Sequence, residues 1–241
     1  MNKAVLSMLV VILLLSCVFA VAEGPKPILF QNIPWGTDYT SVDNTLSDLK
    51  LWQIKGEAFD TKPMEDITWN RYIGKTKFEY TDINIIAHAF NKEMNVAGYT
   101  TSDIVLYFAY TPVDGVLTHE DKDTALYGAT YQFEPADTDS MVSDLKSKLI
   151  SIYGEPNRAG SDTDFVKNSY EITVWTDTNG GVLVLGVQHA PSDSTLYKDT
   201  IWISYIYSEA DNWLQAASDA EKAAALAAQS AVSGNGDVSG L

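Results

Sequence analysis

The alternation of apolar and polar residues along the chain predicts two similar runs of secondary structure, each a helix followed by strands. In the first run, Val42 and Leu46 recur at helical spacing and predict a helix over residues 37–49. Residues 50–78 combine tryptophan, proline and charges, which favours a loop with one or two short strands. Period-two alternation of β-branched and aromatic residues then predicts strands over 83–90, 103–110 and 125–133.

The second run opens with the clearest helix pattern of the chain, over residues 137–153. Val142, Leu145 and Leu149 lie on one stripe, and Gly154 followed by a proline ends the helix. Further strands are predicted over 170–176, 181–188 and 200–207, the first two joined by a hairpin turn. An alanine-rich segment then predicts a last helix.

This order of elements predicts an α+β fold with two layers. Tandem helix-plus-three-strand units would form a mostly antiparallel sheet, because short turns join the strands. We expect one globular domain over 23–208, with halves at 30–133 and 134–208, a C-terminal helix over 209–232 and a flexible tail over 233–241. One face of the sheet would carry the two amphipathic helices.

Residues 1–22 have the features of a secretory signal peptide. Lys3 precedes an apolar run over 6–21, and a small-x-small pattern ends at Ala22. The run is shorter than the roughly 20 residues of a typical membrane span. The segment ending at Cys17 also resembles a bacterial lipobox. We therefore expect a secreted or extracytoplasmic protein, with lipid anchoring at Cys17 as the alternative.

Composition narrows the classes of function. A hydrophobic content of 46% is too high for a disordered chain. The formal net charge of −16, from 16 Lys plus Arg and 32 Asp plus Glu, argues against nucleic-acid binding. The single cysteine is Cys17, so cleavage after Ala22 would leave no disulfide, thiol nucleophile or thiolate ligand.

Two short segments carry a family resemblance. Residues 30–37 read F-Q-N-I-P-W-G-T, and residues 149–156 read L-I-S-I-Y-G-E-P. The first resembles the F-x-x-I-x-x-G-[MT] opening of the β-lactamase-inhibitor-protein-like and outer-membrane small-lipoprotein (BamE/SmpA) group. Both resemble segments of uncharacterised secreted bacterial proteins with an I-P-W-G-[ST] opening. The resemblance implies tandem helix-plus-sheet units that act as exported binding modules, not enzymes.

Metal sites and cofactors are not indicated. His88, His119 and His189 lack the spacing of converging ligands. Acidic residues gather in four places, none of which completes a calcium-binding loop. We interpret them as turn and cap residues. They are Glu120, Asp121 and Asp123; Asp137 and Asp139; Asp162 and Asp164; and Asp177 with Asn179.

No catalytic residue is predicted either. The S-x-x-K match at Ser143–Lys146 lies inside the amphipathic helix and lacks its partner motifs. A phosphate loop and a dinucleotide fingerprint are absent from the sequence. The 32 acidic residues could include the two carboxylates of a glycosidase, but no pattern in the sequence selects such a pair.

Aromatic residues are the strongest binding candidates, because the chain has 6 Trp and 13 Tyr. Our strand register places Tyr107, Trp175 and Trp202 on the sheet face away from the two helices, as a binding face. The alternative is that these residues are not exposed, because the C-terminal helix or residues 52–69 cover them. The assignment to this face also depends on the register, since a slip of one residue moves every side chain to the other face.

The function expected from these patterns is an exported, non-enzymatic binding module for an extracellular or envelope protein or glycan. The first alternative is a hydrolase of cell wall or glycan that uses a pair of the chain's many carboxylates. The second is a lipid-anchored envelope assembly factor, which requires a retained Cys17.

Overall fold

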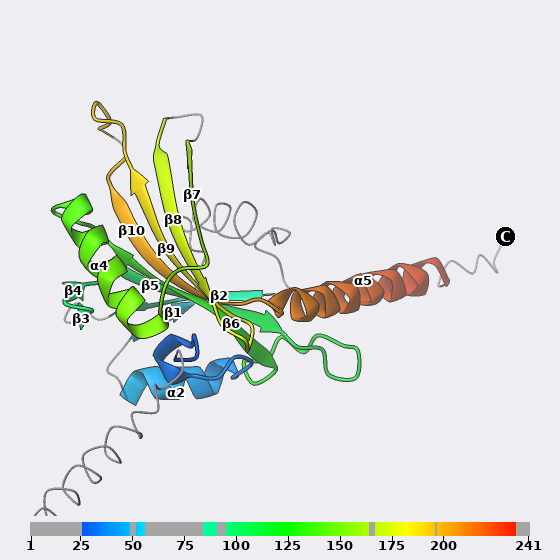
Figure 1. The fold of residues 1–241 in the computed structure, drawn as a ribbon. Helices are drawn as coiled ribbons and strands as arrows, with labels where there is room; N and C mark the ends of the chain where they lie inside the picture. Colours follow the sequence, from blue (N-terminus) through cyan, green and yellow to red (C-terminus); the bar gives the residue numbers. More distant parts are fainter. Residues whose placement is uncertain are drawn as a thin grey trace, which may run out of the picture.

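The computed structural model describes residues 26–48, 52–55, 84–90, 95–163, 167–195 and 197–234. Within that part the chain forms an eight-stranded antiparallel sheet in the order β1-β2-β5-β6-β10-β9-β8-β7 (Figure 1). The first half supplies β1 (Trp52–Lys55), β2 (Asn84–Phe90), β5 (Asp103–Tyr110) and β6 (Thr124–Phe133). The second supplies β7 (Arg158–Thr163), β8 (Ser169–Thr176), β9 (Gly181–His189) and β10 (Thr200–Tyr207). A small hairpin of β3 (Asn95–Val96) and β4 (Tyr99–Thr100) lies between β2 and β5.

The predicted α+β class and antiparallel sheet are confirmed, with one correction to the strand count. Each half contributes four described strands to the sheet, not three. In each half the strands follow one another from an outer edge of the sheet to its centre. At the centre β6 of the first half pairs with β10 of the second, with Tyr131 opposite Ile203. The junction between the two halves is therefore a continuous strand pair.

The two helices predicted from apolar stripes begin and end close to their predicted bounds. Helix α2 (Tyr39–Asp48) is capped by Asp38, whose Oδ1 accepts a hydrogen bond from Ser41 N at 3.0 Å. Helix α4 (Thr138–Tyr153) has Asp137 as its N-cap and ends at Gly154, where φ is +80°. A 3₁₀ turn, η1 (Phe30–Asn32), precedes α2.

The main core lies between the two helices and one face of the sheet. The buried side chains of this core come from both helices and from central strands of both halves, which makes it a single core. From α2 and α4 it includes Val42, Leu46, Leu145 and Leu149, and from the strands it includes Leu106, Phe108, Leu183 and Ile203.

Helix α5 (Ala210–Gly234) covers part of the opposite face. Leu214 and Ala217 pack with Val105 and Tyr107 of β5. Residues 222–231 are exposed, and Figure 1 shows this part of α5 projecting away from the sheet. No helix in the described part of the chain has the length and apolarity needed to cross a bilayer.

Candidate functional site

The three aromatic residues predicted as a binding face do not form one. Their exposed fractions are 5% for Tyr107, 1% for Trp175 and 0% for Trp202. Tyr107 packs beneath α5, whereas Trp175 belongs to the core beneath α2 and α4. The prediction of an exposed face over these residues is corrected, because all three are buried and they lie on two faces of the sheet.

The register of β8 shows why Trp175 was predicted on the wrong face of the sheet. Trp175 points to the helix-covered face, where its Nε1 donates to Gly154 O at 2.8 Å. Its neighbour Val174 packs on the other face with Trp202. Period-two alternation groups Trp175 with Glu171 and Thr173, opposite the apolar set that contains Val174, so it wrongly indicates that Trp175 faces away from the helices.

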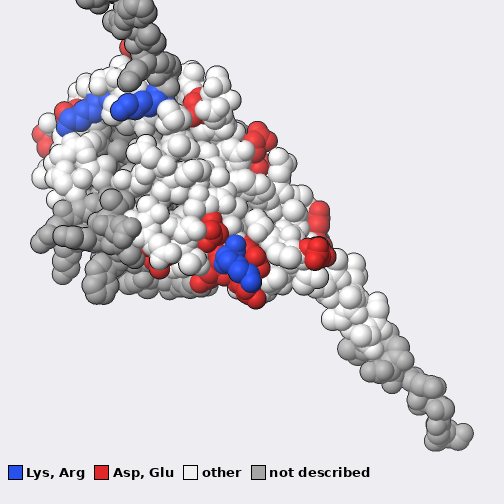
Figure 2. Space-filling view, turned by 90° about the horizontal axis from the view of Figure 1, so that it is seen from below, with Lys and Arg blue, Asp and Glu red and all other residues white. Residues whose placement is uncertain are grey.

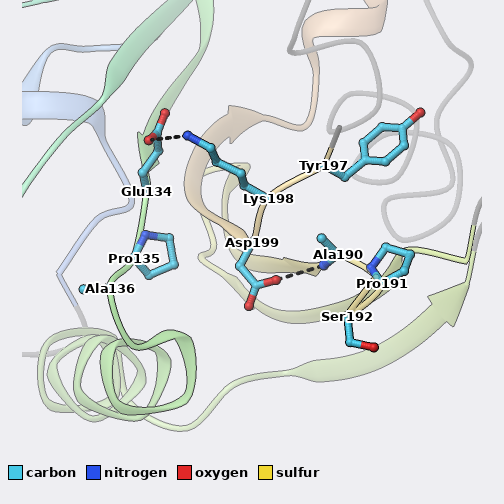
Figure 3. Close-up of a pocket in the computed structure, with 9 residues that line it drawn as sticks. All are labelled: Glu134, Pro135, Ala136, Ala190, Pro191, Ser192, Tyr197, Lys198 and Asp199. Atoms are coloured by element: carbon cyan, nitrogen blue, oxygen red, sulfur yellow. Dashed lines mark hydrogen bonds and ion pairs between the residues drawn. The ribbon is translucent and has the colours of Figure 1, made fainter. Parts of the chain in front are cut away.

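A cleft lies at one end of the central strands, and we call it the Asp199 cleft. The cavity has a volume of about 610 Å³ (Figure 3). Figure 3 shows the β6–α4 connection on one side and the β9–β10 connection on the other. The lining residues are Glu134, Pro135, Ala136, Ala190, Pro191, Ser192, Tyr197, Lys198 and Asp199.

Strand order brings these two connections together. Strands β6 and β9 both pair antiparallel with β10 and flank it, so they run in the same direction. Their carboxyl ends, at Phe133 and His189, therefore meet beside the start of β10 at Thr200. The connections that follow β6 and β9 consequently face each other across the cleft.

Asp199 is the best-anchored polar group of the cleft. Its Oδ2 accepts from Thr138 Oγ1 at 2.7 Å and its Oδ1 from Ala190 N at 2.9 Å. His189 Nδ1 lies 3.6 Å from Oδ2. Burial raises the pKa of Asp199, but the two hydrogen bonds and the nearby imidazole lower that pKa below its ordinary value. The group is therefore a fixed carboxylate anion at neutral pH, and it can only accept hydrogen bonds.

An ion pair marks the rim of the cleft. Lys198 Nζ lies 3.7 Å from Glu134 Oε2, and the two side chains are 81% and 66% exposed. Such an exposed pair adds little stability. Tyr197 is 43% exposed, which leaves part of its ring open to solvent. The rim thus combines solvent-exposed charges with an aromatic surface.

A second cavity of about 350 Å³ adjoins the first and shares its residues Glu134–Ala136. Its far wall is the β3–β4 hairpin, where Tyr99 OH donates to Asp144 Oδ2 of α4 at 2.8 Å. Lys148 Nζ of α4 also donates to Ala97 O in the hairpin at 2.7 Å. These bonds hold the hairpin against α4.

Two of the acidic clusters have structural roles in the described part of the chain, whereas Asp164 lies outside it. Asp137 Oδ1 accepts from Ser140 N as the cap of α4. Asp177 accepts from Gly181 N at 2.8 Å in the β8–β9 turn and from Ile28 N at 2.7 Å. Among the described residues, no three His, Cys, Asp or Glu side chains converge as metal ligands would.

The three histidines lie in three different segments of the fold. His189 ends β9 beside the Asp199 cleft, and His119 stacks edge-on to Tyr110 with ring centroids 4.9 Å apart. His88 lies in β2. Cys17 falls outside the described residues.

Sequence reasoning missed the Asp199 cleft. The available signal was the pair of proline-containing segments after β6 and β9, at Glu134–Ala136 and Ala190–Ser192. That signal becomes informative only once the order β6-β10-β9 is known.

Acidic residues outnumber basic ones in the chain, and the two kinds lie close together on one face of the molecule. Figure 2 shows Lys and Arg in small groups on the face seen from below, with acidic side chains nearby. One described pair of this kind joins Lys122 Nζ to Glu120 Oε2 at 2.7 Å.

Comparisons with family models, with curated protein sequences and with solved structures find no match to this chain.

Proposed function

We propose that this protein is an exported, non-enzymatic binding module and that the Asp199 cleft is its ligand site. The observation that carries the proposal is the fixed carboxylate of Asp199 in a cavity of about 610 Å³. Ligand pockets typically have volumes of about 300–1,000 Å³ and occur where domains or halves meet. A carboxylate held by Thr138 and Ala190 is already oriented before a ligand arrives.

The lining favours a ligand rich in hydrogen-bond donors. Asp199 and Glu134 supply acceptor oxygens, and Lys198 is the one basic residue of the lining. Tyr197 and two prolines supply surface for stacking and apolar contact. A protein segment with exposed Lys or Arg, or a glycan with its hydroxyl groups, has this chemistry. Export rests on the signal-like segment 1–22.

The hydrolase alternative receives less support from the same cleft. A glycosidase needs one carboxyl that stays protonated as a general acid. The pKa of Asp199 is lowered, which is the opposite change. The lipid-anchored alternative depends on Cys17.

The experiment titrates the chain that starts at Glu23 with defined probes, namely Lys/Arg-rich peptides, their neutral counterparts and wall oligosaccharides. Backbone amide shifts in NMR spectra locate the site. We expect one probe class to shift Ala190 and Ser192 saturably. Asp199→Asn should weaken that binding about tenfold or more, since hydrogen bonds to a charged group contribute about 1.5–3 kcal/mol.

The matched control is Asp219→Asn on α5, which removes the same charge from an exposed position. It should leave the dissociation constant unchanged. Saturable binding that maps to another surface would overturn the assignment of the cleft, and so would failure of every probe class. Release of soluble fragments from wall oligosaccharides, abolished by Asp199→Asn, would show that the protein is a hydrolase.

A further inference from the structure

The outer edge of β7 is a surface that shares no lining residue with the Asp199 cleft. Strand β7 is last in the strand order, and no strand in the described part of the chain pairs with its outer side. The main-chain groups of an edge strand can pair with another strand. Side chains of β7 are exposed or half-buried along its length.

The sequence of this edge is self-complementary. It reads Arg158-Ala-Gly160-Ser-Asp162-Thr, so a cation and an anion lie two positions on either side of Gly160. Residues 158, 160 and 162 pair with Val174, Ile172 and Tyr170 of β8, so all three lie on one face of the sheet.

We propose that β7 pairs antiparallel with β7 of a second copy of this chain, about a two-fold axis at Gly160. In that register Arg158 of each copy lies directly opposite Asp162 of the other. Opposite charges facing across an antiparallel pair stabilise it, and like charges destabilise it. A two-fold pair uses the same patch on both copies, so the favourable pairing occurs twice.

The side chains of β7 permit this approach. Gly160 has no side chain at the centre, and its neighbours Ala159 and Ser161 are small. Asp162 has interactions within its own chain, among them the bond that its Oδ1 accepts from Thr163 N at 2.7 Å, so Arg158 of the second copy would be an additional partner of the carboxylate. Charged residues on an edge usually repel other strands, but this symmetric placement makes a second copy of the same edge the favoured partner.

The resulting dimer should be weak. Stable complexes bury about 800 Å² on each partner, and β7 has only 6 residues. We therefore expect association that depends on concentration and reaches only a dimer. The pairing would join two eight-stranded sheets edge to edge.

The test is sedimentation equilibrium of the chain that starts at Glu23, over a concentration series that reaches the millimolar range. Arg158→Asp places like charges opposite each other at two positions, so the dissociation constant should rise about tenfold or more. The double variant R158D/D162R reverses both charges and should restore the wild-type constant. Lys122→Asp, which makes the same charge change in the β5–β6 loop, should leave it unchanged.

Cross-linking tests the register. The chain that starts at Glu23 has no cysteine of its own. Gly160→Cys in that chain should give a covalent dimer with a short bis-maleimide. Ser151→Cys on α4 should not. A monomer at every concentration would overturn the proposal, as would a double variant that associates no better than R158D. Growth beyond a dimer would show that different edges pair and would also overturn it.

Discussion

The indole of Trp202 lies directly over Gly186 on the neighbouring strand β9. A Cβ atom at position 186 would lie 2.0 Å from Cε2 of the indole and 2.1 Å from Cζ2. The two residues are opposite each other in the β9–β10 register. The missing side chain at Gly186 therefore lets the ring lie against the sheet, fully buried, instead of standing out from it as a binding residue would.

Gly186→Ala should destabilise the protein by about 3 kcal/mol, because the added methyl overlaps a buried ring that cannot move away without displacing its neighbours. The free energy of unfolding, measured by urea titration, checks this. In a Trp202→Leu background the same alanine should cost much less, since the smaller side chain leaves room for the methyl. Equal costs in both backgrounds would contradict the contact.

Trp175→Phe should cost about 1 kcal/mol more than Trp202→Phe in the same measurement. Both changes remove similar buried volume, but only Trp175 donates a hydrogen bond from its Nε1, to Gly154 O. Within the described part of the chain, Nε1 of Trp202 is buried without a partner, so its removal loses no bond. If Trp202→Phe is the more damaging change, the two indoles do not have these different roles.

The sequence predicted most of the fold because several signals agree at each element. The stripe of α4, its cap at Asp137 and its stop at Gly154 all indicate the same helix. Strand β7 was missed, because the strands predicted for the second half begin only at residue 170 and Asp162 was interpreted as a turn or cap residue. Its Gly, Ser and Asp are typical of turns, and an edge strand that is exposed on both faces shows no apolar alternation.

The site could not be predicted in the same way, because it depends on contacts between distant parts of the chain. Thr138 and Asp199 are 61 positions apart, and their hydrogen bond requires β10 to pair with β6. The prediction of an exposed aromatic face was wrong for a related reason. Alternation in β8 groups Trp175 with Glu171 and Thr173, and only its packing in the core and its hydrogen bond to Gly154 O show that this set faces the helices.

Asp199→Asn should lower thermal stability at neutral pH and have no effect in strong acid. The folded-state pKa of Asp199 is lowered, so its stabilising contribution is present above the unfolded pKa of about 4 and disappears as pH falls through the folded value. Midpoints of thermal unfolding for both proteins, measured from pH 7 downward, should converge below pH 4. A difference between the midpoints that persists unchanged into acid would show that the variant acts through packing and not through the charge.

Removal of the end of α5 should leave the folded domain almost as stable as before. Residues 222–231 are exposed, so a chain that ends at Lys222 should lose less than about 0.5 kcal/mol of unfolding free energy. Leu214→Ala should instead cost about 2–5 kcal/mol, because Leu214 is fully buried against β5. Urea titration of the two variants, with far-UV circular dichroism to record the lost helix, separates these cases. A large loss of stability on truncation would mean that the exposed half of α5 packs against another surface in solution.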